Sequence, residues 1–118
     1  MIILPEIHKL KLNSDFRRAY GRGKSYSDPA LVTYVLRNNR AGVCRVGITT
    51  GKKIGNAVVR NRCRRVITAA LNDIYSDISG GCDIVFVARR RAVFSKSTSV
   101  AAAMAEHLEK AGVLRLRQ

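Results

Sequence analysis

GKKIGNAVVRNRCRRVITAA, residues 51 to 70, holds six Lys or Arg residues among its first fifteen positions and no acidic residue. The glycine-bracketed loop Gly51 to Gly55 comes first, and Asn56 is a suitable N-cap for a helix that reaches about Ile78. At about 100° per residue, the apolar side chains of this helix share one broad stripe, which predicts packing against a sheet. The stripe contains Val59, Cys63, Val66, Ile67, Ala70, Leu71, Ile74 and Ile78.

The N-terminal part of this helix and the loop before it are basic. Positive charge at a helix N-terminus opposes the helix dipole and costs roughly a few tenths of a kcal/mol per charge, whereas a bound anion reverses that cost. The segment therefore indicates an anion-binding surface, with a solvated basic surface as the alternative interpretation. Its glycine spacing differs from the Walker A pattern, so a nucleotide-binding loop is rejected. The basic residues are Lys52, Lys53, Arg60, Arg62, Arg64 and Arg65.

The whole chain shares this basic character. Its 118 residues contain 22 Lys and Arg against 8 Asp and Glu, which gives a formal net charge of +14. Such a charge indicates a polyanion partner, with nucleic acid as the first candidate and an anionic membrane surface as the second. No apolar run has the length of a signal-peptide core or a transmembrane helix, so we expect a soluble, cytoplasmic protein with one domain, residues 1–118.

Three segments have the composition of β-strands. Residues 30–37 and 43–50 are joined by turn-forming residues, which predicts an antiparallel hairpin. Residues 83–89 are an apolar run bounded by the charges of Asp83 and Arg89, and they are expected at the centre of the sheet. The second strand alternates, so that one of its faces is small and polar and suits a ligand. That face consists of Arg45, Gly47 and Thr49.

Two further helices complete the expected fold. A short helix that reaches about Tyr20 is predicted, with Asn13 or Ser14 as its N-cap, and a last helix is predicted from Ser97 or Ser99 to Gly112. The resulting order α-β-β-α-β-α predicts an α+β fold, a two-layer α-β sandwich. An additional short strand is expected near Ser25 or after Arg89, with residues 1–12 as an N-terminal arm and residues 114–118 as a loose tail.

Phe16, Tyr20 and Tyr34 form a second candidate site. Phe16 and Tyr20 stand four residues apart on one face of the short helix, and Tyr34 lies in a predicted strand. Such aromatic side chains either stack on single-stranded bases or attach the helix to the sheet. Spacing alone favours attachment, because an apolar pair at this spacing usually belongs to a core.

The sequence contains no catalytic or metal-binding motif. His8 and His107 lie at opposite ends of the chain, and no Ser/His/Asp or Cys/His signature is present. Cys44, Cys63 and Cys82 are too widely spaced for a zinc site and are expected to be buried, reduced thiols. We therefore expect no catalytic residue and no metal ligand in this chain, so that any chemistry comes from a partner.

Three motifs together resemble the bacterial ribonuclease P protein subunit. They are RVGITTGKKIGNAVVRNRCRR at Arg45 to Arg65, NSDFRRAYGRGKS at Asn13 to Ser25, and DIVFVARR at Asp83 to Arg90. The resemblance extends over residues 9–113, nearly the whole chain. It implies an α-β sandwich with a left-handed βαβ crossover, whereas the usual hand is right.

The resemblance also implies a function. The family is the basic partner of a catalytic RNA, ribonuclease P RNA, and the two together remove the 5′ leader from precursor tRNA. The RNA and its bound Mg²⁺ perform the hydrolysis, while the protein binds the RNA and the single-stranded leader. No membrane and no obligate protein partner are expected. The alternative is a ribosomal or other structural RNA-binding protein without a processing role, and a stand-alone nuclease is the more distant rival.

The resemblance assigns roles to individual residues. Cys63, Thr68 and Arg91 depart from the residues that are common in the family, and Cys63 remains apolar on the inner stripe. The residues that match the family's basic helix motif and its lysine-rich approach, and so face the catalytic RNA, are Lys52, Lys53, Arg60, Asn61, Arg62, Arg64 and Arg65. The residues that match the leader-binding cleft are Phe16, Arg17, Tyr20, Tyr34, Arg45 and Arg90.

Overall fold

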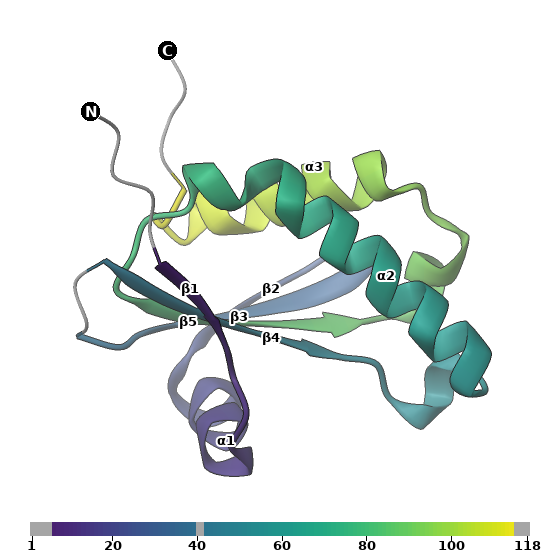
Figure 1. Ribbon diagram of the computed structural model, residues 1–118, viewed down its shortest axis with the longest axis horizontal. Coiled ribbons are helices and arrows are strands. Elements are labelled where there is room, and N and C mark those ends of the chain that lie inside the picture. The colour runs from purple at the N-terminus through teal and green to yellow at the C-terminus, as the bar shows by residue number, and fades with distance from the viewer. Residues whose placement is uncertain (1–5, 40–41, 115–118) are drawn as a thin grey trace.

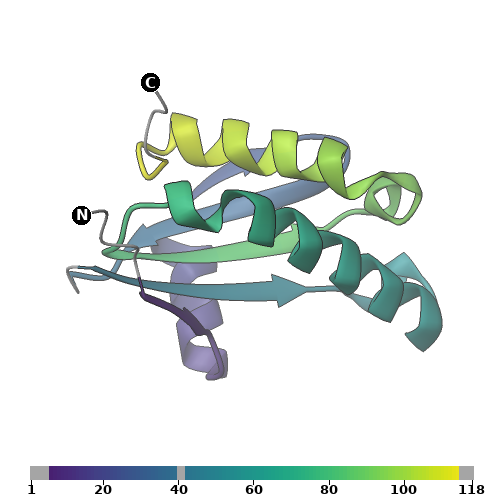
Figure 2. The same ribbon diagram turned by 45° about the horizontal axis from the view of Figure 1, so that its top comes forward.

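The computed structural model describes residues 6–39 and 42–114. It contains a five-stranded sheet in the order β1-β4-β5-β3-β2, with α2 and α3 on one face and α1 on the other (Figures 1 and 2). The expected α+β architecture is therefore confirmed. The elements are β1 (Glu6–Lys9), α1 (Asn13–Arg22), β2 (Lys24–Ser27), β3 (Leu31–Arg37), β4 (Val43–Thr49), η1 (Lys52–Ile54), α2 (Ala57–Ile74), η2 (Tyr75–Asp77), β5 (Cys82–Ala88), η3 (Arg90–Phe94) and α3 (Ser97–Lys110), where η marks a 3₁₀ helix.

The predicted hairpin of β3 and β4 is wrong. β5 lies between these two strands, antiparallel to β3 and parallel to β4. The physical reason is that β5 is buried on both faces: Cys82 to Phe86 are all buried, with the Asp83 carboxylate paired with Arg45, so the strand requires neighbours on both edges and cover on both sides. The central position expected for this strand is confirmed. The turn-forming residues after β3 therefore join strands that are not neighbours.

The connection from β4 through α2 to β5 is a crossover between parallel strands. In Figure 1 both strands point to the right, α2 lies above them, and β5 lies behind β4. This arrangement is left-handed, as the family resemblance implied, although nearly all such connections are right-handed.

The ends of the sheet differ from the expectation in detail. The additional strand near Ser25 is confirmed as β2, whereas the segment after Arg89 is the 3₁₀ helix η3. Part of the N-terminal arm forms β1, which pairs in parallel with β4 from Glu6↔Val43 to Lys9↔Val46. Residues 1–5 of that arm, and residues 115–118 of the tail, lie outside the described residues.

The helix ends follow local chemistry with two corrections. Asn56 caps α2 as predicted, because its side-chain oxygen accepts a hydrogen bond from the Val59 N–H at 3.0 Å. α2 ends at Ile74, four residues before the predicted end, and η2 follows it. Leu12 occupies the N-cap position of α1 without a side-chain cap, so the predicted cap at Asn13 or Ser14 is wrong. α3 begins at the first of its two predicted start positions.

The main core lies between the sheet and the two helices α2 and α3. The inner stripe predicted for α2 is confirmed, since Cys63, Ile67 and Ala70 are fully buried and its other members are buried or half-buried. Met104 and Leu108 of α3 complete this layer. The three cysteines are buried, free thiols, as expected. Packing of α2 in this way leaves its basic side toward solvent.

Candidate nucleic-acid interface

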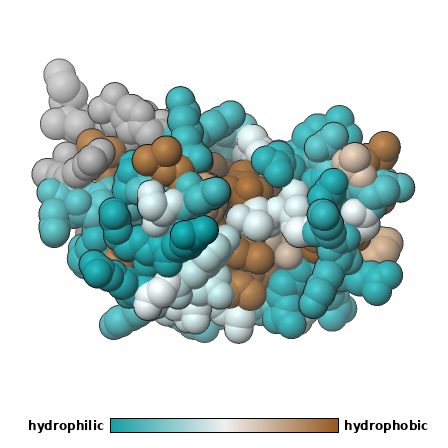
Figure 3. All heavy atoms as spheres, turned by 90° about the horizontal axis from the view of Figure 1, so that it is seen from below, coloured by the Kyte–Doolittle hydropathy of each residue, from teal (hydrophilic) through white to brown (hydrophobic). Residues whose placement is uncertain are grey.

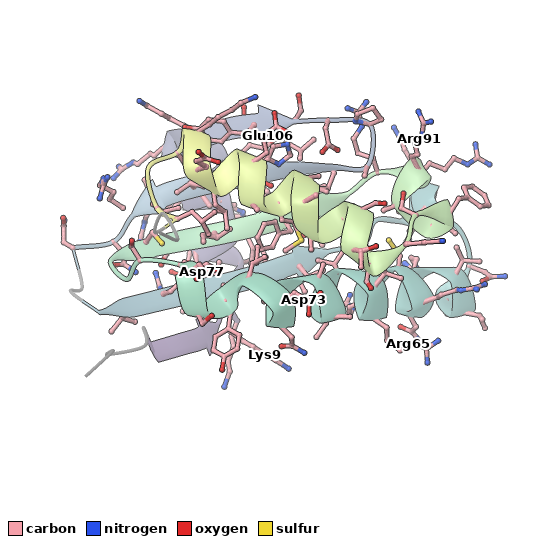
Figure 4. All side chains as sticks on the ribbon, turned by 90° about the horizontal axis from the view of Figure 1, so that it is seen from above. Lys9, Arg65, Asp73, Asp77, Arg91 and Glu106 are labelled. Atoms are coloured by element: carbon pink, nitrogen blue, oxygen red, sulfur yellow. The ribbon has the colours of Figure 1, made fainter. Side chains whose placement is uncertain are left out.

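The basic residues of α2 lie at one end of the molecule, which we call the basic end. The parallel strands β4 and β5 both finish there, so η1 and η3, which follow them, meet each other beside the start of α2. Figure 4 shows Arg65 on the outer side of α2 and Arg91 on η3 at this end, while Asp73 and Asp77 lie toward the opposite end of α2 and η2. The residues of the basic end are Lys52, Lys53, Arg60, Asn61, Arg62, Arg64, Arg65, Arg89, Arg90 and Arg91.

The charge at the basic end is available to a partner. Arg60 is half-buried, and the other residues of the basic end are exposed. None of the ion pairs found among residues 6–39 and 42–114 involves a cation of this group. Arg64 donates a hydrogen bond to the Thr50 hydroxyl at 3.2 Å, which leaves its charge without a counter-ion. The first turn of α2 carries no acidic residue that would offset these cations.

The three aromatic residues meet on the other face of the sheet, where α1 crosses it. The rings of Tyr20 and Tyr34 lie edge to face with their centroids 5.0 Å apart, and those of Phe16 and Tyr20 are 6.5 Å apart. Phe16 packs on Gly47 so closely that a Cβ atom at Gly47 would lie 2.5 Å from the ring. The small residue predicted on this face of β4 therefore has a packing reason.

These rings both pack and remain accessible. Phe16 and Tyr34 are half-buried, whereas Tyr20 is 40% exposed and its hydroxyl lies 3.1 Å from the Thr49 hydroxyl. The packing confirms that these aromatics attach α1 to the sheet, while stacking on single-stranded bases stays a prediction. A shallow depression of about 340 Å³ borders Phe16, Tyr20 and Thr49, and exposed Arg17 lines it as well.

Sheet residues beyond α1 extend this area: Thr49, which the sequence indicated, lies on the same face as Val32 and Val87, which it did not. Val32, Val87 and Thr49 form one row across β3, β5 and β4, and all three are half-buried. In Figure 3 this face carries a band of brown and near-white atoms between groups of hydrophilic side chains. The period of two along each strand could have found these residues, because each lies two positions from a residue of the Tyr34 row. We call Phe16, Tyr20, Val32, Tyr34, Thr49 and Val87 the aromatic surface.

A second depression connects the aromatic surface with the basic side of α2. It has a volume of about 210 Å³ and passes the outer edge of β4, where Gly47 and Ile48 lie. Phe16 of α1 lines it on one side, and Arg64 and Thr68 of α2 line it on the other. An extended ligand can therefore contact aromatic rings and arginine side chains without leaving this part of the molecule.

Arg45 occupies a different environment from the one expected of a cleft cation. Its guanidinium donates to the Asp83 carboxylate, with an Nε–Oδ1 distance of 2.8 Å, and lies 3.3 Å from the Asp15 carboxylate. The hydrogen bonds to Asp83 raise the pKa of Arg45 above its ordinary value. The side chain is only 17% exposed, so its charge is neutralised inside the protein. Arg90, the other flanking arginine, is exposed in η3 at the basic end.

Other kinds of site find little support in the described residues. No group of three or more His, Cys, Asp or Glu side chains that could hold a metal ion occurs among them. Asp15 of α1 and Asp83 of β5 are engaged by Arg45. Within the same residues, no helix has the length and apolar character needed to cross a membrane. Phe94, which is 84% exposed at the end of η3, is one more aromatic side chain that sequence analysis missed.

Comparisons with known proteins agree with this arrangement. The family model described as Ribonuclease P matches residues 4–112. The ribonuclease P protein component of Clostridium beijerinckii is 40% identical over 113 residues, which cover 91% of this chain and 90% of that protein. The solved ribonuclease P protein of Staphylococcus aureus has a TM-score of 0.78 at 31% identity, covering 92% of this chain and 98% of that one. The chain, with its left-handed crossover and basic helix, belongs to the family of ribonuclease P protein components.

Proposed function

We propose that this chain is the protein subunit of a ribonuclease P holoenzyme that removes the 5′ leader of precursor tRNA by endonucleolytic cleavage. It binds ribonuclease P RNA through the basic end and the single-stranded leader through the aromatic surface. The observation that carries the proposal is the depression beside Gly47, which places Phe16 and Arg64 on opposite walls of one groove.

Contact with the catalytic RNA follows from charge and helix geometry. Exposed guanidinium groups on successive turns of α2 can form bidentate hydrogen bonds with phosphate oxygens, which a lysine ammonium group cannot do. Lys52 and Lys53 of η1 add point charges before the helix begins. Bound phosphates would also offset the unfavourable charge at the helix N-terminus. The proposed contacts are Lys52, Lys53, Arg60, Asn61, Arg62, Arg64 and Arg65.

The leader is held by stacking. Tyr20 and Tyr34 present ring faces and edges beside the row of Val32, Val87 and Thr49, a surface on which unpaired bases can stack. Phe16 fixes α1 on β4 and borders both depressions, and Arg17 supplies a positive charge near the strand. Arg45 is assigned a positioning role through Asp15 and Asp83 in place of a contact with RNA.

The hydrolysis is assigned to the RNA and the Mg²⁺ ions that it binds. The described acids beside the proposed leader path are paired with arginine and do not form a ligand set that suits Mg²⁺. This chain would neutralise phosphates and hold the substrate, and it would thereby lower the Mg²⁺ concentration that the RNA needs. We place the complex in the cytoplasm, without a membrane or an obligate second protein.

Reconstitution tests this proposal. Cleavage of precursor tRNA by the ribonuclease P RNA of the same organism is measured at low Mg²⁺, with and without the purified chain. The expected result is strong stimulation by the chain, a correct 5′ end, and no cleavage by the chain alone. Unchanged RNA activity would favour the structural RNA-binding alternative, and cleavage by the chain alone would show a stand-alone nuclease.

A further inference from the structure

A second basic region lies on the α1 side of the sheet, away from the basic end. A depression of about 280 Å³ is lined by Arg18 and Arg22 of α1, Arg37 of β3, and Arg45 of β4. Asp83 is the acidic residue that lines it. The strand row that contains Arg45 and Asp83 lies two residues before the row of Gly47 and Val85, toward the start of β4 and β5.

α1 separates this depression from the aromatic surface. Arg18 and Arg22 follow Asp15 at helical spacings of three and seven residues, so they share one side of the helix. Phe16 and Tyr20 project from the other side, beyond buried Ala19, which faces the sheet. A ligand on the aromatic surface therefore does not enter this depression without passing over α1.

The acids here neutralise only part of the charge. Arg45 is bound by Asp83 and Asp15, and Arg18 lies 3.9 Å from Asp15. Arg22 and Arg37 belong to none of the ion pairs found in the part of the chain that the structure describes. Both side chains are exposed, so two guanidinium groups remain free to bind an anion.

A neighbouring depression extends the basic area around the edge of the sheet. It has a volume of about 350 Å³, shares Arg22 and Arg37 with the first one, and adds Lys24 of β2. Lys110 also lines it and is paired with Glu106 at 3.0 Å. We call Arg18, Arg22, Lys24 and Arg37 the second basic surface.

The second basic surface is not well explained as a group of solvated cations that bind no ligand. Arg22 stands in the last turn of α1, where a cation is favourable, but Arg37 ends a strand and has no such reason. Like charges around one concave area repel each other and concentrate the positive potential there. Flexible guanidinium groups around an open groove match the phosphate groups of an extended polyanion better than a small enclosed ligand.

We propose that the second basic surface binds backbone phosphates of an RNA segment other than the one at the basic end. The inference rests on the proposed function. The two surfaces lie near opposite ends of seven-residue strands, roughly 20 Å apart at about 3.3 Å per residue. The chain therefore holds RNA at two separate places on either side of the leader, either on ribonuclease P RNA or on the tRNA body.

The test compares two double variants with the same loss of charge. Arg22→Gln with Arg37→Gln removes the two unpaired guanidinium groups, and Lys11→Gln with Lys96→Gln removes two exposed charges that line none of the depressions described above. Affinity for ribonuclease P RNA, and affinity of the assembled holoenzyme for precursor and mature tRNA, are measured between 50 and 200 mM salt. Urea unfolding midpoints are expected to equal the wild-type value for both variants.

The salt slope is the slope of log affinity against log salt concentration. We expect its magnitude for the arginine variant to fall by roughly 0.7–0.9 for each lost phosphate contact. For two contacts, its loss of affinity from 50 to 200 mM salt is then about tenfold smaller than the wild-type loss. A change in the first assay assigns the surface to ribonuclease P RNA, and a change only in the second assigns it to tRNA. The lysine control is expected to differ little from wild type.

Equal slopes for the arginine variant and the lysine control overturn the inference. A selective loss of binding to vesicles that contain phosphatidylserine, with RNA binding intact, also overturns it and assigns the surface to a membrane. Failure of the proposed function looks different, because the wild-type chain would then not stimulate the RNA at all. Stimulation by wild type together with equal slopes rejects only the second basic surface.

Discussion

Arg45 and Arg62 are the same residue type in two contrasting regions. Arg45 lies beneath α1 with 17% of its side chain exposed and contacts two carboxylates, whereas Arg62 projects from α2 into solvent without an ion pair in the described residues. A buried arginine with its own acids contributes to the fold, and an exposed arginine without acids is available to a partner. Counting basic residues in the sequence does not separate the two roles.

The largest effect is expected from a substitution that breaks the buried ion pair of Arg45 and Asp83. Arg45→Ala leaves Asp83, which is 1% exposed, without its guanidinium partner, and Asn38 is the remaining side-chain donor to that carboxylate among the described residues. We expect a loss of about 3 kcal/mol in the free energy of unfolding, measured by urea denaturation. Arg62→Ala is the matched control and should change it by less than about 0.5 kcal/mol. Similar stabilities for the two variants would contradict the contrast.

Tyr20→Ala is expected to have the next largest effect, on leader binding. Loss of one stacked base should weaken the holoenzyme's binding of leader-bearing precursor by about 1–3 kcal/mol, with little change for mature tRNA. Tyr20→Phe keeps the ring, loses the contact with the Thr49 hydroxyl, and should retain most of the affinity. Equal losses for both substrates would show that Tyr20 only attaches α1 to the sheet.

A smaller effect is expected from the exposed arginines. Arg62→Gln with Arg65→Gln should lower affinity for ribonuclease P RNA by roughly tenfold, about 1.4 kcal/mol, and reduce the salt slope by about 1 to 2. The midpoint of urea unfolding should stay at the wild-type value, because neither side chain is buried. An unchanged salt slope would contradict direct contact with phosphates.

His107 tests whether a second buried side chain forms an ion pair as Arg45 does. Beside Asp28, it is either charged and ion-paired or neutral and hydrogen-bonded. Its Nε2 lies 3.5 Å from Asp28, and its Nδ1 lies 2.8 Å from the Thr33 hydroxyl. Burial, with a smaller contribution from Lys110, lowers the pKa of His107 below its ordinary value despite the opposing charges of Asp28 and Glu106. The unfolded chain, with a histidine pKa of about 6.5, then binds the proton more tightly, so stability should fall as the pH drops below that value.

Urea midpoints at pH 7.5 and 5.5 measure this effect, which we expect to be the smallest of the four. His107→Gln should show a weaker decline on acidification than wild type, because one proton-binding group is removed from the unfolded chain. A wild-type chain that gains stability relative to His107→Gln on acidification would instead indicate a charged pair with Asp28, similar to Arg45 with Asp83.

Much of the fold could be predicted because it depends on local patterns. The apolar stripe from Cys63 to Ile74 predicted which side of α2 is buried, and the apolar run of β5 predicted that this strand lies inside the sheet. The pairing of β3 with β4 failed because two strands separated by a turn look like a hairpin whether or not a third strand enters between them. That insertion depends on a contact between residues 31–37 and 82–88, which no local pattern encodes.

The candidate site also has one part that local sequence patterns predicted and another part that they could not predict. The basic end could be found from sequence, since Arg62 and Arg65 fall on the side of α2 opposite its apolar stripe. The environment of Arg45 could not, because Asp15 and Asp83 are 30 and 38 positions away along the chain. Val32 shares a strand face with Tyr34 by the period of two, but the sequence does not show that α1 leaves Val32 and Val87 uncovered on that face.

The position of β5 also bears on how the protein is made. The pair β2–β3 and the pair β1–β4 are not neighbours in the sheet, so the sheet is incomplete until residues 82–88 have left the ribosome. One late strand then joins both halves and brings η3 beside η1. Synthesis therefore completes the proposed nucleic-acid interface only near its end, and the nascent protein does not present the finished geometry until most of its length has emerged.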